Sequence, residues 1–250
     1  MTEQTLTGRT ALVTGAGSGI GAGIAHVLAA RGAEVTVADI NAEAAERVAG
    51  EIGGRTWIVD LGDTTALDSL TLSTDILVNN AGIQQVSPIE DFDPERWRLI
   101  LRIMLEAPFL LIRAALPQMY ARGWGRIINI SSVHGLVASP YKSAYITAKH
   151  GLEGLSKVTA AEGATKGVTS MCINPGYAWT PLVEHQLADQ AATHRMSIDE
   201  VTEKVILARQ SIKDFVQPTD LGEMVAFLCG PHSTMITGTN FIADGGWVAR

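Results

Sequence analysis

Short runs of apolar, often β-branched residues alternate along this chain with longer segments in which apolar residues recur every three or four positions. In most of the short runs consecutive residues are apolar, which is typical of parallel strands that helices cover on both faces. The longer segments have the length and period of helices. The pattern predicts seven strands, at residues 10–14, 34–39, 55–60, 75–80, 125–131, 168–174 and 239–244.

Strands that alternate with helices predict an α/β fold built on a doubly wound parallel sheet. The 250 residues, of which 46% are hydrophobic, can bury one large core, and neither a linker-like segment nor an internal repeat divides them. We therefore expect a single domain over residues 1–250. In such a sheet ligands bind at the carboxyl ends of the strands, so the residues that follow each strand are the first candidates for chemistry.

Charge and hydropathy argue against two classes of partner. The formal net charge of −7 and the isoelectric point of about 5.3 disfavour nucleic acid. The most apolar stretch, residues 99–116, contains Arg102, Glu106 and Arg113 and cannot span a membrane, and the polar N-terminus lacks the apolar core of a signal peptide. We expect a soluble, cytoplasmic protein that binds neither nucleic acid nor membrane.

No metal site is predicted. Cys172 and Cys229 lie far apart without the spacing of metal ligands, and His185 and His194 lack partners at such a spacing. Both cysteines are interpreted as reduced thiols in the core.

The first expected strand runs into a glycine-rich turn, TGAGSGIG at residues 14–21. Glycines at a strand-to-helix turn let the backbone approach a pyrophosphate, which the N–H groups of the following helix then stabilise. Asp39 ends the second strand, where a carboxylate can hold the ribose hydroxyls of an adenosine. This carboxylate would repel the extra phosphate of NADP, and neither the turn nor Ile40 supplies a cation, so the expected cofactor is NAD.

Two further segments follow strands and are expected to contact the cofactor. Asp60 could receive the adenine amino group, although an aspartate at a strand end is more often a helix cap. NNAG, at residues 79–82, places small residues and amide side chains at the carboxyl end of the fourth strand.

The residues that suit chemistry follow the fifth strand. Tyr145 and Lys149 lie four residues apart, on one face of a helix expected to begin near Ser143, and Ser132 comes directly after the strand. In carbonyl–alcohol interconversion a tyrosine passes a proton to or from the substrate oxygen, a serine holds that oxygen and a nicotinamide exchanges the hydride. The tyrosine pKa must then fall by about three units, roughly 4 kcal/mol. One ammonium about 4 Å away supplies roughly that much at an effective dielectric of about 20.

Together these motifs, with NPG at residues 174–176, resemble the short-chain dehydrogenase/reductase family over essentially the whole chain. The resemblance implies a Rossmann-type sheet of seven strands, a catalytic set of Ser132, Tyr145 and Lys149, a bond from Lys149 to the nicotinamide ribose, and a homotetramer. The cofactor-binding residues that it implies are Gly15, Gly17, Ser18, Gly19, Ile20, Gly21, Asp39, Asp60, Leu61, Asn80, Ala81, Gly82, Tyr145, Lys149, Pro175 and Gly176.

Lys142, one helical turn before Tyr145, could be the counter-charge of a small carboxylate, with three further polar donors beside it. The segments NNAGIQ, GRIINISSVHGLVAS, KSAYITAKHG and NPGYAWTPLVEHQ resemble the subfamily that interconverts (R)-3-hydroxybutyrate and acetoacetate. By this resemblance Trp247 helps close the site, from this chain or from a neighbouring subunit. The substrate-binding residues that it implies are Gln84, Ser132, His134, Lys142, Tyr145, Gln186 and Trp247. Tyr141 has no assigned role and is interpreted as structural.

Residues 182–215 are mostly helical by period and follow the sixth strand, where the family places a substrate lid; a solvated helix face is the alternative. Met104 stands where the family has an asparagine that helps hold a proton-relaying water, and Tyr177 replaces a tryptophan of the subfamily. The stretch from Asp60 to Asp75 is short, so its helix should be cut down.

Two alternatives stay open because of Tyr177 and Met104. One is a dehydrogenase for another small hydroxy acid or ketone, and the other is an NAD-binding sensor weakened in catalysis by Met104.

Overall fold

The computed structural model of the protein describes residues 5–181, 183–184, 187, 191 and 195–249. Its centre is one parallel sheet with the strand order β3-β2-β1-β4-β5-β6-β7. The strands are β1 (Thr10–Thr14), β2 (Glu34–Asp39), β3 (Arg55–Ile58), β4 (Ile76–Asn79), β5 (Gly125–Ile130), β6 (Val168–Pro175) and β7 (Asn240–Ala243). All seven predicted strands are confirmed, and their ends differ from the prediction by at most two residues.

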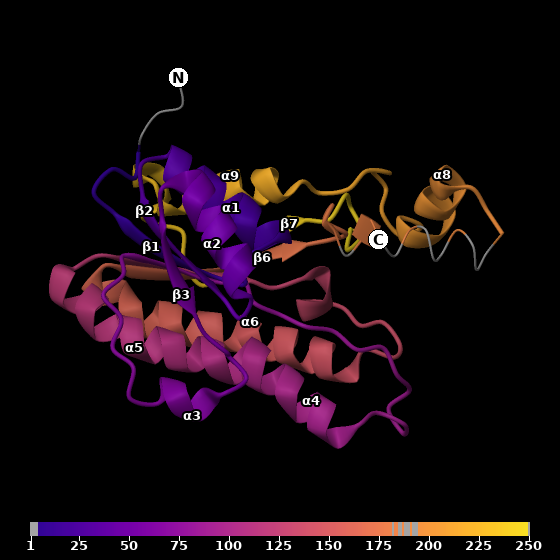
Figure 1. The fold of residues 1–250 in the computed structure, drawn as a ribbon, viewed down its shortest axis with the longest axis horizontal. Helices are drawn as coiled ribbons and strands as arrows, with labels where there is room; N and C mark the ends of the chain where they lie inside the picture. The colour runs from indigo at the N-terminus through magenta and orange to yellow at the C-terminus, as the bar shows by residue number, and fades with distance from the viewer. Residues whose placement is uncertain (1–4, 182, 185–186, 188–190, 192–194, 250) are drawn as a thin grey trace.

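Helices cover both faces of the sheet, as the apolar strands require (Figure 1). One face carries α1 (Gly19–Ala30), α2 (Ala42–Ile52) and α9 (Pro218–Cys229), and the other carries α4 (Pro94–Leu101), α5 (Ala107–Arg122) and α6 (Ser143–Gly163). A π-helical turn, η1 (Arg102–Glu106), joins α4 to α5. The remaining short helices are α3 (Thr64–Leu67), η2 (Val133–Gly135), η3 (Ala164–Lys166), α8 (Ile198–Val201), η4 (Thr202–Ile206) and η5 (Pro231–Ser233).

The order of the strands determines where the binding crevice lies. The chain crosses from β3, at one edge, back to the middle of the sheet, so β1 and β4 are neighbours whose following segments run to opposite faces. This reversal opens a crevice at the carboxyl ends of the two strands, where doubly wound sheets bind their ligands. The glycine-rich turn and NNAG both lie there.

Two predictions about helices have different outcomes. The helix between β3 and β4 is cut down to the four residues of α3, as expected. The helical expectation for residues 182–215 is confirmed at 198–206 but is wrong for 207–215, which contain no helix. Long-range hydrogen bonds outweigh the helical period there, because Ser211 N and Ile212 N both donate to the carbonyl of Gly245 in the C-terminal turn.

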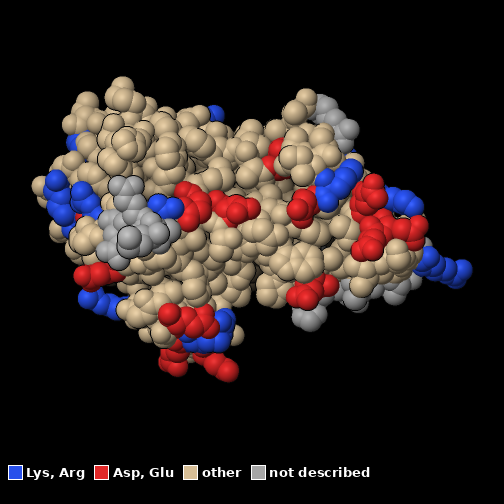
Figure 2. Space-filling view, turned by 90° about the horizontal axis from the view of Figure 1, so that it is seen from above, with Lys and Arg blue, Asp and Glu red and all other residues tan. Residues whose placement is uncertain are grey.

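Charged side chains of both signs are interspersed on the face shown in Figure 2. Lysines and arginines lie beside aspartates and glutamates, so this face has no broad positive surface. Among the described residues, no helix is both long and apolar enough to cross a membrane.

Candidate active site

The glycine-rich turn lies so close to its neighbours that side chains would not fit. A Cβ atom on Gly17 would stand 2.9 Å from Asp39 Oδ2, and one on Gly21 would stand 2.3 Å from the carbonyl oxygen of Gly15. Gly15 has a φ of +62°, and its Cβ would meet Ala81 at 2.8 Å. The turn therefore presents bare backbone to the crevice, as a pyrophosphate site requires.

Hydrogen bonds join this turn to NNAG. Asn80 Nδ2 donates to the carbonyls of Thr14 and Gly15, at 2.9 and 3.1 Å. Thr14 Oγ1 in turn accepts from the backbone N–H groups of Asn80 and Ala81, at 3.0 and 3.1 Å. These bonds bring the first and fourth strand ends together, as the sequence predicts.

Backbone amides hold the Asp39 carboxylate in place. Gly17 N donates to Oδ2 at 2.9 Å and Asn41 N donates to Oδ1 at 3.0 Å. Each carboxylate oxygen keeps a lone pair that a ribose hydroxyl could use. The residues around the turn thus fit the adenosine and pyrophosphate of a dinucleotide.

One cation near the turn was missed by sequence reasoning. Arg47, on α2, donates from Nη2 to the carbonyl of Gly17 at 2.9 Å, and the amide of the same glycine donates to Asp39. Arg47 is adjacent in sequence neither to the turn nor to Asp39, so no local pattern marks it. Arg47 follows Asp39 by eight residues, and the second turn of α2 brings it there.

The other expected cofactor residues lie at the same edge of the sheet. Asp60 comes two residues after β3, and its Oδ1 accepts from Gly62 N at 2.7 Å. Asp63, not Asp60, caps α3. Leu61 is buried, Ser18 is the N-cap of α1, and Gly19 and Ile20 open that helix. Further along the edge, β6 ends at Pro175, the amide of Gly176 donates to the carbonyl of Ala243, and Gly82 follows Ala81.

Ser132, Tyr145 and Lys149 are brought together. The helix α6 begins at Ser143, as expected, and its first two turns carry Tyr145 and Lys149. A hydrogen bond with Ser132 stabilises the Tyr145 phenolate, and Lys149 Nζ lies 5.6 Å from the centre of the Tyr145 ring. Lys149 Nζ donates to the carbonyl of Ile130 at 2.6 Å. The predicted catalytic set therefore exists as a spatial cluster.

The expected lowering of the Tyr145 pKa is not seen in this structure. Burial raises the pKa of Tyr145, and the hydrogen bond with Ser132 opposes this only in part. Burial also lowers the pKa of Lys149 to about 8. The Lys149 ammonium donates to the Ile130 carbonyl, and it lies 5.6 Å from the centre of the Tyr145 ring.

The predicted substrate side of the site is only partly assembled. His134 is buried, its Nε2 lies 2.9 Å from Ser139 Oγ, and its ring meets Tyr145 edge to face with centroids 6.1 Å apart. Burial, followed by the charges of Lys142, Arg209 and His150, lowers the pKa of His134 to about 4. His134 is thus a neutral hydrogen-bonding group near pH 7.

Lys142 and Trp247 also border the site. Lys142 is the residue before α6, and burial lowers the pKa of its half-buried ammonium. The Trp247 ring of this chain lies 5.6 Å from the His134 ring and 5.7 Å from the Tyr177 ring, centre to centre. Within the described part of the chain, the Lys142 ammonium has no hydrogen-bond or ion-pair partner.

The contacts of the described residues do not join Gln84 to the cluster. Gln84 is exposed in the loop after β4, and its side chain makes no hydrogen bond to the described residues. Gln186 lies outside the described residues, as do His185 and His194. Tyr141 is 59% exposed with a φ of 69°, and its carbonyl accepts from Ser87 N, in keeping with a structural role. Both cysteines are buried free thiols, and no metal-ligand cluster occurs among the described residues.

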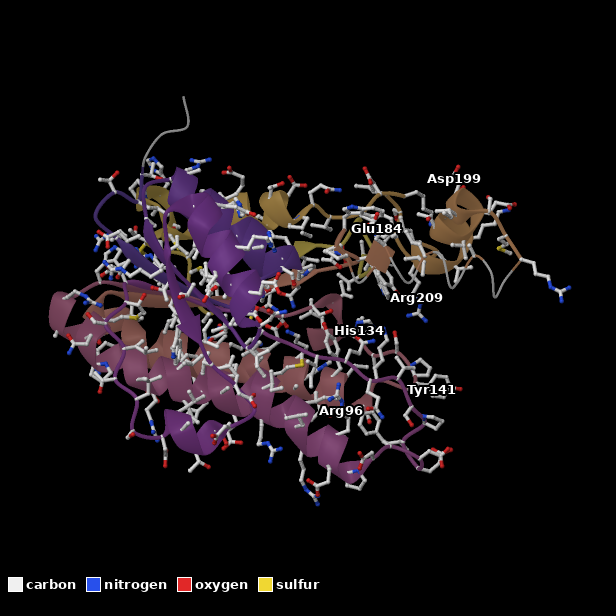
Figure 3. All side chains as sticks on the ribbon, viewed as in Figure 1. Arg96, His134, Tyr141, Glu184, Asp199 and Arg209 are labelled. Atoms are coloured by element: carbon white, nitrogen blue, oxygen red, sulfur yellow. The ribbon has the colours of Figure 1, made fainter. Side chains whose placement is uncertain are left out.

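Arg209 is the second cation that sequence reasoning missed. Figure 3 shows its side chain directed toward His134, and its guanidinium carbon lies 5.8 Å from the centre of the Trp247 ring. A cavity of about 380 Å³ opens here, lined by Val137, Ala208, Arg209, Trp247 and Val248. No pattern in the sequence marks Arg209, because it follows the helices of the 182–215 segment and reaches the site only through the folded C-terminal turn.

The site combines a glycine-rich turn, a carboxylate that could hold a ribose, and a cluster of serine, tyrosine and lysine. This combination defines an oxidoreductase that uses a nicotinamide cofactor. The short chain dehydrogenase family matches residues 9–191, and the chain belongs to this family.

Relatives and solved structures resemble the chain over its whole length. It is 44% identical to a D-beta-hydroxybutyrate dehydrogenase of Cupriavidus necator, covering 98% of this chain and 100% of the relative. It is 43% identical to a protein of the same name from Rhizobium meliloti, covering 97% and 99%. A crystal structure from Agrobacterium tumefaciens with bound NADP, assigned as a 2-deoxy-D-gluconate 3-dehydrogenase, has a TM-score of 0.87 and 34% identity, covering 100% of both chains.

Proposed function

We propose that the protein interconverts (R)-3-hydroxybutyrate and acetoacetate with NAD. The observation that carries the proposal is the Lys142 ammonium, half-buried beside Tyr145 and His134 and unpartnered among the described residues. An ammonium that has lost part of its hydration favours an anionic partner. The 43 to 44% identity to D-beta-hydroxybutyrate dehydrogenases supports a small hydroxy acid as that partner.

In the proposed reaction Tyr145 takes the hydroxyl proton of the substrate, while Ser132 holds the same oxygen. Lys149 lies on the same face of α6 and supplies positive charge near the phenol ring. A nicotinamide cofactor held by the glycine-rich turn and Asp39 would supply the acceptor for the hydride that leaves the carbon as it becomes the ketone. Lys142 binds the carboxylate, and neutral His134 donates a hydrogen bond to it.

The proposed cofactor is NAD because Asp39 places a fixed negative charge where a 2′-phosphate would lie. Two observations weigh against this preference: Arg47 is close to the turn, and two solved structures similar to this chain contain NADP. Initial rates with NAD and NADP at equal concentration test the cofactor. Equal rates with both would overturn the preference and point to Arg47 as the offsetting cation.

A spectrophotometric panel of hydroxy acids and neutral alcohols, each with NAD, tests the substrate. We expect the highest kcat/KM with (R)-3-hydroxybutyrate and a much lower value with the (S) enantiomer. A higher value with a ring-bearing hydroxy acid would favour a second substrate class. One relative, 36% identical, is a cis-4-hydroxycyclohexanecarboxylate dehydrogenase, and Tyr177 and Trp247 could border such a ring.

Met104 keeps a second function open, that of an NAD-binding sensor with little turnover. Met104 is 1% exposed in η1 and lies against Gly82, where a Cβ would stand 3.4 Å from its Cε. Its thioether cannot hold a water as an amide can. The Met104→Asn substitution should raise kcat per folded molecule, measured from the initial rate of NADH formation.

The same substitution should lower the free energy of unfolding by about 1 to 3 kcal/mol, because the amide replaces sulfur among apolar neighbours such as Ile100, Ala144 and Ala148. Met104→Leu is the matched control, with neither effect large. A rate that stays the same or falls in Met104→Asn would remove the basis of the relay argument. Tight NADH binding without NADH formation would favour the sensor.

A cytoplasmic homotetramer stays a prediction. A groove of about 610 Å³ on α4, η1, α5 and α6 supports an interface between subunits. Five large apolar residues line it, Trp97, Leu101, Leu105, Phe109 and Leu155, together with the charged residues Arg98, Arg102 and Glu106. Light scattering coupled to size exclusion would measure the mass in solution.

A further inference from the structure

Glu153 is a buried carboxylate behind the active site, and the reaction described above does not use it. It lies on α6 one turn after Lys149 and is 5% exposed. Its Oε1 accepts from Asn174 Nδ2 and its Oε2 from Asn240 Nδ2, each at 2.6 Å. Burial of a carboxylate is costly, and two short amide bonds offset part of that cost while fixing the position of the group.

One of the two amides connects Glu153 to Ser132. Asn174 Nδ2 has two hydrogens, and it donates to Glu153 Oε1 and also to the backbone carbonyl of Ser132, at 2.8 Å. The carboxylate also lies against η2, since a Cβ on Gly135 would stand 2.7 Å from Oε1. Glu153 thus holds, through one amide group, the backbone of the residue whose hydroxyl meets the substrate oxygen.

The charge of Glu153 also faces Lys149. Burial lowers the pKa of Lys149, and negative charge on Cys172 and on Glu153 opposes this. Burial and the Glu153 carboxylate raise the pKa of the Cys172 thiol, so this thiol is neutral near pH 7. Of the two opposing groups, Glu153 is therefore the one whose charge acts on Lys149 in the working pH range.

We propose that Glu153 is a positioning residue of the active site. Its carboxylate fixes the Ser132 backbone through Asn174 and supplies the negative charge that compensates the Lys149 ammonium. The effect on turnover rests on the proposed oxidoreductase reaction, whereas the effect on Lys149 does not.

The test compares Glu153→Gln with Glu162→Gln, which removes an equal charge from an exposed position of the same helix. The ¹³Cε shift of Lys149, assigned with Lys149→Met, is titrated in each protein without substrate or cofactor. We expect the protonated-to-neutral ratio of Lys149 to fall about tenfold in Glu153→Gln at any given pH, equal to about one pKa unit. Glu162→Gln should titrate as the parent does.

Two further variants separate charge from position. Glu153→Asp keeps the negative charge, but its shorter side chain moves the carboxylate away from Asn174. We therefore expect kcat to fall severalfold while Lys149 titrates as in the parent. Asn240→Ala removes the amide that does not reach Ser132, so the melting temperature should fall while the pH profile of kcat stays unchanged. Should Glu153→Gln not fold, Glu153→Asp and Asn240→Ala decide the positioning role, because equal losses of kcat in both would overturn it.

An unchanged Lys149 titration in folded Glu153→Gln would overturn the electrostatic part of the proposal. Lack of turnover with every hydroxy acid in the parent protein would instead reject the proposed function, and the titration would still report on Glu153.

Discussion

Charged side chains have different partners at the two ends of the parallel sheet. At the amino ends of the strands, buried Asp75 accepts from Thr10 N at 2.9 Å and pairs with Arg122 Nε at 3.2 Å. The guanidiniums of Arg9 and Arg126 lie over the Trp124 ring, 3.8 and 4.5 Å from its centre. Here positive and negative side chains meet each other directly.

At the carboxyl ends, three ionisable side chains have no side-chain partner among the described residues. Asp39 accepts only from amides, Lys149 donates to a carbonyl, and Lys142 has no partner in the part of the chain that the structure describes. Lys142 and Arg209 both act on His134 with positive charge. At the amino edge, the described charges pair with one another and stabilise the fold. At the carboxyl edge, which we call the incomplete edge, charges are left that an anionic substrate and a dinucleotide could pair with.

Replacement of Tyr145 gives the sharpest contrast between the two edges. Tyr145→Phe removes only the hydroxyl that moves the proton, so kcat should fall by about 10³-fold or more. Stability and cofactor binding should change little, since the ring contacts with His134 persist. Initial rates, NADH fluorescence titration and thermal melting measure the three quantities. A variant that keeps a tenth of the parent rate would exclude Tyr145 as the acid–base group.

Asp75→Ala should do the reverse. It leaves the arginines at the amino edge without their carboxylate, and we expect the free energy of unfolding to fall by about 3 kcal/mol. Activity per folded molecule should be retained, because Asp75 lies at the end of the sheet opposite the site. Denaturant unfolding and initial rates are the measurements. Asp68→Ala, which removes an exposed partner of Arg113, is the control and should cost less than about 1 kcal/mol.

Lys142→Ala should affect affinity more than rate. The loss of a charge-assisted bond to a carboxylate should raise KM for (R)-3-hydroxybutyrate by about 10- to 100-fold. KM for a neutral secondary alcohol should stay nearly constant, and Lys142→Arg should recover part of the affinity. Equal rises of KM for the acid and the neutral alcohol would contradict a carboxylate role.

The fold could be predicted from the sequence because the strand pattern and the segment after each strand are local signals. The catalytic cluster could be predicted for the same reason, since Tyr145 and Lys149 share a helix face and Ser132 closely follows a strand. Arg47, Glu153 and Arg209 could not be predicted, because their roles depend on how a helix or a turn packs against the site. The pKa of Tyr145 is raised by burial, whereas the sequence predicted that it is lowered. The sequence shows a nearby lysine but not the extent of burial.

His134 offers the mildest test of the incomplete edge, through the pH dependence of stability. Burial and the neighbouring positive charges lower its pKa from 6.5 to about 4 in the folded protein. Between these pH values His134 is protonated in the unfolded chain but neutral in the folded protein. The free energy of unfolding should therefore fall as the pH decreases, by at most about 1.4 kcal/mol per pH unit. His134→Gln should flatten this slope in denaturant unfolding from pH 6.5 to 4, whereas His232→Gln, at an exposed position, should not. A slope that is the same in both variants would mean that burial and the neighbouring positive charges do not lower the pKa of His134, and the carboxyl edge would then lose one of its arguments for binding an anion.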